Sequence, residues 1–185
     1  MGVYKYLVQA WRSPTALHES LKQKMVSWRS EPVTLRIEHA TRLDRARALG
    51  YRAKQGIFLV RQRVKKGSHQ RPDWSGGRHS HNMGVRMNLH KNYQQISEER
   101  ANKAFVNCEV LNSYYVGEDG KSYWYEVIMV DRAHPSVLAD KRTAISKQRG
   151  RAYRGVTSAG RRTRGLNRKG MGAEKVRPSR RANPV

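Results

Sequence analysis

The stretch 106–130, VNCEVLNSYYVGEDGKSYWYEVIMV, decides the fold of this chain. Apolar and polar residues alternate from Val106 through Cys108 to Val110, and Tyr123–Val130 is almost continuously aromatic or aliphatic. Both patterns predict β-strands. The turn-forming residues Gly117–Gly120 stand between them, which favours a hairpin. The three consecutive aromatics at 123–125 must point to alternating faces, and we expect them mainly to cover a small sheet.

Further elements are predicted on both sides of this hairpin. Ser13 can cap a helix that has Pro14 at its first position and ends at Glu31-Pro32. Its apolar face consists of Leu17, Leu21, Met25 and Trp28. Alternation predicts a strand at 33–37, and another at Ile57–Val64. Acidic residues after Ser97 indicate a helix start there, and Pro135-Ser136 opens a last helix through about Gln148. We therefore expect an α+β fold with a small mixed or antiparallel sheet packed with helices.

Charge limits the possible partners. The 185 residues contain 38 Lys and Arg against 14 Asp and Glu, a formal net charge of +24. Such a chain needs a polyanion, and nucleic acid releases counterions when its phosphates are bound. A membrane is not expected, because the longest apolar runs are far shorter than the roughly 20 residues of a spanning helix. The N-terminus lacks the pattern of a signal peptide. The single cysteine, Cys108, excludes an intramolecular disulfide and fits the cytoplasm.

The charge is distributed unevenly along the chain. Residues 98–131 hold seven acids and three bases, whereas residues 141–185 hold fifteen bases and one acid, Glu174. The basic end is rich in glycine and poor in large apolar residues, so we expect it to be disordered without RNA. The polar stretch 65–91 is too long for an ordinary connection, which indicates a functional loop. We predict a core at 1–148 with this basic loop inserted, and a basic extension at 149–185.

No arrangement of residues supports catalysis. His69, His79, His81 and His90 gather in the polar loop, but no cysteine or zinc-finger spacing accompanies them, so we expect no metal. Cys108 is interpreted as a core residue, and the acidic pairs at 98–99 and 118–119 as solvated charges. No phosphate-binding glycine loop of the nucleotide-hydrolase type is present. The chain is predicted to be no enzyme and to use no cofactor or small-molecule substrate.

Three stretches resemble a known family. They are TRLDRARALGYRAKQG at 41–56, the region from SEERANKAF through VLNSYYVGEDG to EVIMVDRAHP, and RGVTSAGRRTRGLNRKGMGAEKVRPS at 154–179. In order and spacing they are similar to the fifteen-e family of large-subunit ribosomal proteins, of the archaeal and eukaryotic type, and the short C-terminus looks archaeal. The resemblance implies a mixed α/β core and basic extensions that thread between helices of large-subunit ribosomal RNA. It also implies contacts with neighbouring ribosomal proteins and a place in the cytoplasmic ribosome.

The residues themselves are consistent with RNA binding. In 41–56, arginines surround Gly50 and Gly56, so the backbone can approach phosphate while guanidinium groups form bidentate hydrogen bonds to it. In the extension, glycines recur every five residues from Gly155 to Gly170 among arginines. Trp74, without apolar neighbours, is interpreted as a base-stacking residue. The side chains predicted to contact RNA are Arg42, Arg45, Arg47, Tyr51, Arg52, Lys54, Gln55, Arg61, Arg63, Lys65, Lys66, His69, Arg71, Trp74, Arg78, His79, His81, Arg86, Lys91, Arg149, Arg151, Arg154, Arg161, Arg162, Arg164, Arg168, Lys169, Lys175, Arg177, Arg180 and Arg181.

The function expected is that of a structural constituent of the large ribosomal subunit, which binds and stabilises folded ribosomal RNA through its phosphates. The alternative is a general nucleic-acid-packaging protein of the nucleoid type. Such a protein would share the charge but needs little beyond non-specific cation density.

Overall fold

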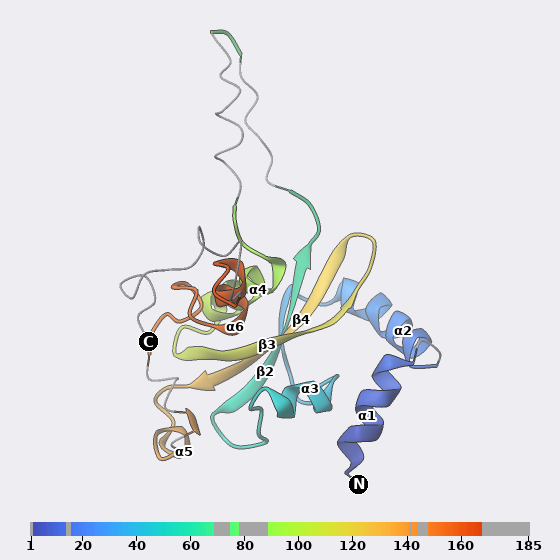
Figure 1. Ribbon diagram of the computed structural model, residues 1–185, viewed down its shortest axis with the longest axis vertical. Helices are drawn as coiled ribbons and strands as arrows, with labels where there is room; N and C mark the ends of the chain where they lie inside the picture. The colour runs from blue at the N-terminus through green and yellow to red at the C-terminus, as the bar shows by residue number, and fades with distance from the viewer. Residues whose placement is uncertain are drawn as a thin grey trace.

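A four-stranded antiparallel sheet forms the centre of the molecule (Figure 1). The computed structural model describes residues 2–13, 16–68, 75–77, 89–140, 142–143 and 148–167. The strands are β1 (Thr34–Ile37), β2 (Ile57–Lys65), β3 (Cys108–Glu118) and β4 (Ser122–Asp131). Their order in the sheet is β1-β2-β4-β3, and every neighbouring pair is antiparallel. The predicted α+β class is confirmed, and the sheet is antiparallel rather than mixed.

The hairpin that connects β3 to β4 lies where the sequence predicts it. The Asp119 N–H donates to the carbonyl of Ser122 at 2.9 Å and closes the turn. The Asp119 carboxylate accepts from the backbone N–H groups of Lys121 and Ser122 at 2.7 and 2.6 Å. Asp119 is therefore a turn-stabilising residue rather than a freely solvated charge, since its side chain supplies the acceptors that the turn backbone needs.

Six helices flank the sheet among the described residues: α1 (Val3–Arg12), α2 (Ala16–Ser30), α3 (Leu43–Ala48), α4 (Tyr93–Ala104), α5 (Pro135–Leu138) and α6 (Ser158–Thr163). The expected helix before Pro32 is confirmed as α2. None of the described helices has the length and apolar composition needed to cross a bilayer. Helices α1, α3 and α6 had no counterpart among the predicted elements.

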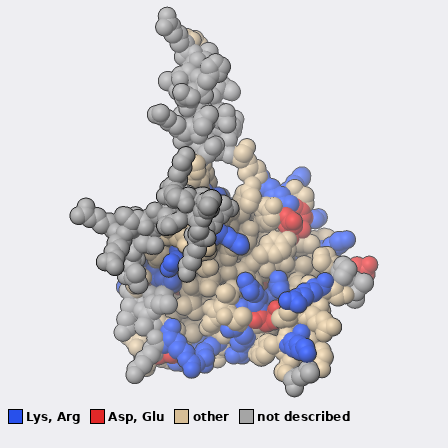
Figure 2. Space-filling model, viewed as in Figure 1, with Lys and Arg blue, Asp and Glu red and all other residues tan. Residues whose placement is uncertain are grey.

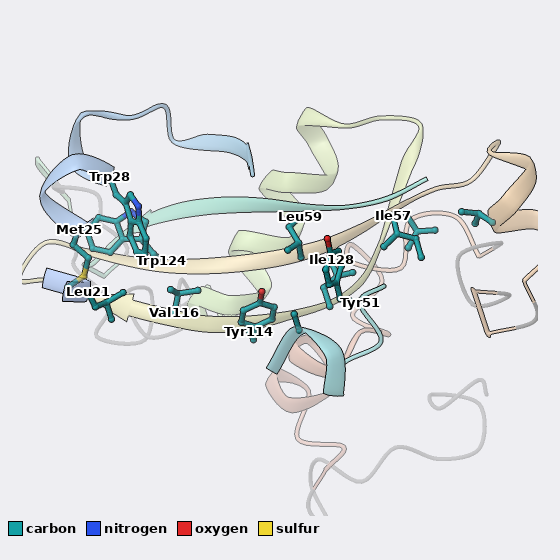
Figure 3. Close-up of a cluster of buried hydrophobic side chains, with 13 residues drawn as sticks. Leu21, Met25, Trp28, Tyr51, Ile57, Leu59, Tyr114, Val116, Trp124 and Ile128 are labelled. Carbon is teal, nitrogen blue, oxygen red and sulfur yellow. The ribbon is translucent and has the colours of Figure 1, made fainter. Parts of the chain in front are cut away.

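Each face of the sheet carries its own hydrophobic cluster. On one face, Leu21, Met25 and Trp28 of α2 cover Trp124 and Val116 (Figure 3). On the other face, Ala101 of α4 packs with Val110 of β3 and with apolar side chains of the central strands β2 and β4. Trp124 points to the first face, whereas Tyr123 and Tyr125 point to the second, where Tyr93 stacks on Tyr123 with ring centroids 4.9 Å apart. The aromatic run at 123–125 thus covers both faces of the sheet.

Two helix boundaries differ from the prediction. Helix α4 begins at Tyr93, not at Ser97, because the side chain of Asn92 caps it by accepting from the Gln95 N–H at 2.7 Å. The sequence pattern did not indicate this cap, because Asn92 directly follows a polar stretch that is predicted as a loop. Helix α5 ends at Leu138 instead of reaching Gln148. There the Asp140 side chain accepts from the Arg142 N–H at 3.0 Å, which favours a turn over further helix.

Residues 148–167 lie against the sheet and α4, although the sequence predicts an extension apart from the core. Ala152 and Ala159 are buried, and α6 contacts both α4 and β3. Positive φ at Gly150, Gly155 and Gly165 folds the segment into compact turns. Of the glycines that recur every five residues, Gly155 and Gly165 therefore form turns, whereas Gly160 lies within α6. The rest of the predicted extension, and residues 69–74 and 78–88 of the predicted loop, lie outside the described residues.

Candidate nucleic-acid interface

Arginines from three distant parts of the sequence line one hollow on the surface. Arg12 comes from the last turn of α1, Arg42 and Arg45 from the start of α3, and Arg162 from α6. The hollow has a volume of about 420 Å³ and is also lined by Trp11, Asp44 and Tyr115. We call it the arginine groove. In Figure 2, Lys and Arg side chains gather over the face that carries α1 and α3.

Among the residues that the structure describes, side-chain partners are found for one of the four groove arginines, Arg42. The guanidinium of Arg42 lies 4.5 Å from the centre of the Trp11 ring and 3.5 Å from the Asp44 carboxylate. Arg12, Arg45 and Arg162 are exposed and form no ion pair with any described residue. Their charges are therefore available to an external anion, and phosphate matches the planar guanidinium especially well.

A buried glutamate fastens the segment that carries Arg42 and Arg45. The carboxylate of Glu126, in the middle of β4, accepts from the Thr41 N–H at 3.1 Å and from the Tyr114 hydroxyl. Burial raises the pKa of Glu126, and the hydrogen bonds from Thr41 and Tyr114 oppose that shift. Ala46 anchors the other side of α3 in the hydrophobic cluster. The arginines thus project from a short helix that is fixed by both polar and apolar contacts.

Two further buried glutamates fasten residues 148–167. Glu98 of α4 accepts from the hydroxyls of Ser113 and Thr157, and burial raises its pKa. Glu109 of β3 accepts from the Gly150 N–H at 2.8 Å. The prediction that Glu98 is a solvated charge at a helix start is wrong, because α4 begins five residues before it. Glu98 therefore lies inside the helix and faces the sheet.

The structure separates the predicted RNA-binding residues into two described groups. Exposed side chains are available to a partner, although Lys54 and Lys91 pair with Asp140 and Glu99 at 3.5 and 2.8 Å. This exposed group comprises Arg45, Arg47, Arg52, Lys54, Gln55, Lys65, Lys91, Arg149, Arg154, Arg161 and Arg162. Arg42 is partly buried at the groove.

The side chains of the second group are buried or bound to partners within the chain. Tyr51 is buried in the hydrophobic cluster, and the Arg151 guanidinium donates to the Val110 carbonyl at 2.8 Å. Arg61 pairs with Glu31 over the Trp28 ring. The other side chains held by internal partners are Arg63, Lys66 and Arg164. Their cationic character in the sequence does not distinguish them from surface arginines, since only the fold shows which carbonyl or carboxylate they reach.

The remaining predicted residues lie outside the described part of the chain. They are His69, Arg71, Trp74, Arg78, His79, His81, Arg86, Arg168, Lys169, Lys175, Arg177, Arg180 and Arg181.

Sequence reasoning missed Trp11 and Arg12. The signal that could have found them is the spacing of Leu7, Val8 and Trp11, which lie on one side of α1 and are partly buried. Once that helix is predicted, Arg12 is recognised as a basic residue in its last turn, directly after Trp11.

Candidate catalytic and metal-binding groups are not found where the structure can be described. Cys108 is buried, and burial raises the pKa of its thiol to about 11, so the thiol is protonated near neutral pH. No group of three or more His, Cys, Asp or Glu side chains in the described ranges could hold a metal ion. Fold and groove together define a protein that displays arginines on a rigid α+β scaffold.

The chain belongs to the ribosomal L15e family. The family model, described as Ribosomal L15, matches residues 2–183. The large ribosomal subunit protein eL15 of Methanocorpusculum labreanum is 50% identical over 182 residues, which cover 96% of this chain and 94% of the relative. The same-named protein of Methanocella arvoryzae is 48% identical over 184 residues, with the same coverage. The predicted family and its archaeal type are confirmed. Membership in a family of ribosomal proteins also confirms that the chain is not an enzyme.

Proposed function

We propose that this chain is a structural constituent of the large ribosomal subunit in the cytoplasm, where it binds and stabilises folded large-subunit ribosomal RNA through phosphate contacts. The relatives that are about half identical over nearly their whole length are named as large-subunit proteins. The net charge of +24 favours a polyanionic partner, because like charges repel in the compact state. Ribosomal RNA supplies that partner within the same particle.

The observation that carries the proposal is the convergence at the arginine groove. Arg12, Arg45 and Arg162 meet there from sequence positions up to 150 residues apart, and they find no carboxylate among the described residues. Like charges brought together without counterions repel one another, so the arrangement is costly unless an anion binds. A rigid groove of this kind follows the shape of a folded backbone, because it fixes where each phosphate must lie.

Neighbouring ribosomal proteins are the second class of proposed partner. Helix α1 exposes Val3, Tyr4 and Tyr6, which are 71%, 46% and 61% exposed. Exposed aromatic and aliphatic residues on one short helix are typical of a protein–protein contact. The basic stretches 65–91 and 149–185 complete the proposed RNA contacts, as the sequence predicts.

The test compares two variants with the same loss of charge. Arg12, Arg45 and Arg162 are changed to Gln in one variant, and Lys24, Arg100 and Lys103, which are exposed elsewhere, in the other. We expect only the groove variant to fail to co-sediment with large subunits at moderate salt. Its binding to ribosomal RNA should also lose about 0.7–0.9 of salt slope per lost phosphate contact.

Two outcomes would contradict the proposal. Equal incorporation of both variants would show that the groove makes no specific contact with the subunit. Equal affinity of the wild-type chain for duplex DNA and folded ribosomal RNA at matched salt would favour the packaging alternative.

A further inference from the structure

The floor of the arginine groove is the free edge of the sheet. β3 is the outermost strand, and Ser113, Tyr114 and Tyr115 line the groove. The Gln94 side chain donates to the Ser113 carbonyl at 2.9 Å, so the backbone of Ser113 faces away from β4. Tyr115 follows two residues later in an unbroken register, and its backbone faces the same way. The Ser113 N–H donates to the Asn112 side chain at 2.9 Å, so Tyr115 supplies the peptide groups that the groove presents beside its cations.

Asp44, which lines the groove, carries an acceptor that lacks a donor among the described residues. Asp44 is 7% exposed, and one carboxylate oxygen, Oδ2, lies 3.5 Å from the Arg42 guanidinium. The other oxygen, Oδ1, is buried and has no hydrogen-bond partner among the described residues. A buried acceptor without a donor is costly, by roughly 1–3 kcal/mol or more when charged. Phosphate cannot remove this cost, because it carries no donor at neutral pH and repels the carboxylate.

A nucleotide has the chemistry that a bare phosphate lacks. Its phosphates suit Arg12, Arg45 and Arg162, and its base carries N–H groups that a carboxylate can accept. The flat stack of Arg42 on Trp11 forms one wall of the groove, and Tyr115, which is 41% exposed, lies at another. A hollow of about 420 Å³ falls within the range that encloses small organic ligands.

We propose that the arginine groove binds one unpaired nucleotide of the RNA, with the Asp44 carboxylate turning into the groove to accept from the base and the flanking phosphates bound by Arg12, Arg45 and Arg162. This inference rests on the proposed function, because it specifies which feature of the RNA the groove takes. Guanine fits best, since its Watson–Crick edge presents two neighbouring N–H donors. Uracil fits worst, because its single imide N–H lies between two carbonyl oxygens that the carboxylate would repel.

The competing explanation is purely structural. Asp44 is an acid in the first turn of α3, where it interacts favourably with the helix dipole and holds Arg42. In that case the groove binds phosphates without regard to the base, and a change at Asp44 weakens every RNA equally through loss of stability. Base selectivity therefore separates the two explanations.

The test uses the full-length chain and RNA heptamers UUUXUUU, in which X is guanosine, adenosine, cytidine, uridine or an abasic ribose. All five probes carry the same phosphate charge. We expect the guanosine probe to bind at least about fivefold more tightly than the uridine or abasic probe, as hydrogen bonds to a charged acceptor are worth that much or more. Asp44→Asn should remove most of this advantage and leave the affinity for the abasic probe within about twofold.

Stability is measured alongside, because Asp44→Asn could unfold α3. Should it do so, Trp11→Leu provides a second variant that keeps Asp44 and removes the aromatic wall. It should reduce the preference for any base over the abasic ribose. Arg100→Gln, on the exposed face of α4, is the control that should leave the selectivity unchanged.

Equal binding of all five probes by the wild-type chain, together with normal incorporation into large subunits, would overturn the nucleotide proposal and leave the proposed function intact. An unchanged guanosine preference in a folded Asp44→Asn variant would equally overturn the role of Asp44. Failure of the wild-type chain to bind ribosomal RNA or to join large subunits would instead refute the proposed function.

Discussion

Segments 41–56 and 148–167 are both attached to the sheet, but through different kinds of contact. Each is rich in arginine, each contributes to the arginine groove, and each is attached to the sheet through buried glutamate. The first segment also inserts Ala46 and Tyr51 into the larger hydrophobic cluster. The second buries only small apolar residues such as Ala152 and Ala159, and otherwise depends on hydrogen bonds to Glu98 and Glu109 and from Arg151 to the Val110 carbonyl.

The difference indicates how a strongly basic segment can be attached with or without an apolar anchor. Burial of an aromatic side chain stabilises the first segment by an amount largely independent of salt and pH. The second segment depends on buried carboxyl acceptors and on close backbone contact, both of which are sensitive to single substitutions. We therefore expect changes in the second segment to release it from the sheet while the rest of the fold persists.

The largest effect is expected from Gly160→Ala. A Cβ at this position would lie 2.5 Å from the Cα of Gly155, and backbone atoms cannot move aside as a side chain can. We expect a loss of about 3 kcal/mol, at the upper end for overpacking. Limited trypsin digestion should then cut at Arg149 and Arg154. Gly120→Ala, with no atom within 4 Å of the new Cβ, is the matched control. Intact Arg149 and Arg154 sites in the Gly160 variant would contradict the close packing of the two turns.

The second effect tests the glutamates directly. Glu98→Ala leaves the hydroxyls of Ser113 and Thr157 without their acceptor, and should cost about 2 kcal/mol. Hydrogen exchange should accelerate in 148–167. Glu126→Ala should leave 41–56 attached, because Ala46 and Tyr51 remain buried. Glu98→Gln, whose amide can still bond to both hydroxyls, should retain most of the stability. Equal release of both segments by the two Ala variants would remove the distinction between them.

A smaller effect concerns pH. Burial raises the pKa of Glu98 above its ordinary value of 4.5, so the folded chain retains a proton that the unfolded chain has released. The stabilisation that this proton adds to the free energy of unfolding is fully present below pH 4.5. It is lost as the pH rises through the folded-state pKa. The unfolding free energy of the wild type, relative to Glu98→Gln, should therefore fall as pH rises from 4.5. Urea unfolding at several pH values measures this difference, and a difference that grows with pH would exclude the buried, protonated carboxyl.

The smallest effect is expected at the outer edge of the second segment. The Tyr153 hydroxyl donates to the Glu99 carbonyl at 3.2 Å, but the residue is exposed. Tyr153→Phe should change the unfolding free energy by less than about 0.5 kcal/mol, since water replaces the bond. Tyr114→Phe, which removes a buried donor to Glu126, should cost several times more by the same thermal or urea measurement. Similar costs for both would mean that burial does not strengthen the bond at Glu126.

Much of the sheet could be predicted because its signals are local. The alternation around Cys108, the apolar run at 123–130 and the turn at 117–120 each lie within a few residues, and all appear in the structure. Helix α2 was predicted for the same reason, since Leu21, Met25 and Trp28 repeat at helical spacing and are buried. Of the arginines at 42 and 45, which the sequence predicts to contact RNA, Arg45 is exposed and Arg42 is partly buried at the groove.

The rest depended on contacts that no local pattern contains. Arg149, Arg151 and Arg154 belong to one short Gly/Arg-rich stretch, yet of these three only Arg151 turns inward to the Val110 carbonyl. Glu98 is adjacent to Glu99, but the earlier start of α4 directs it into the sheet. The groove itself unites residues 12, 42, 45 and 162, and this proximity arises only when three segments fold together.

The side chains that cover the edge of β3 have a consequence for the chain before it meets its partners. An open strand edge invites another strand to pair with it, which is a common route to aggregation. Arg151 occupies the Val110 carbonyl and Gln94 the Ser113 carbonyl, so two of the edge positions cannot accept from a foreign strand. The neighbouring exposed arginines add repulsion between copies. Newly synthesised molecules should therefore remain monomeric until they assemble with their partners.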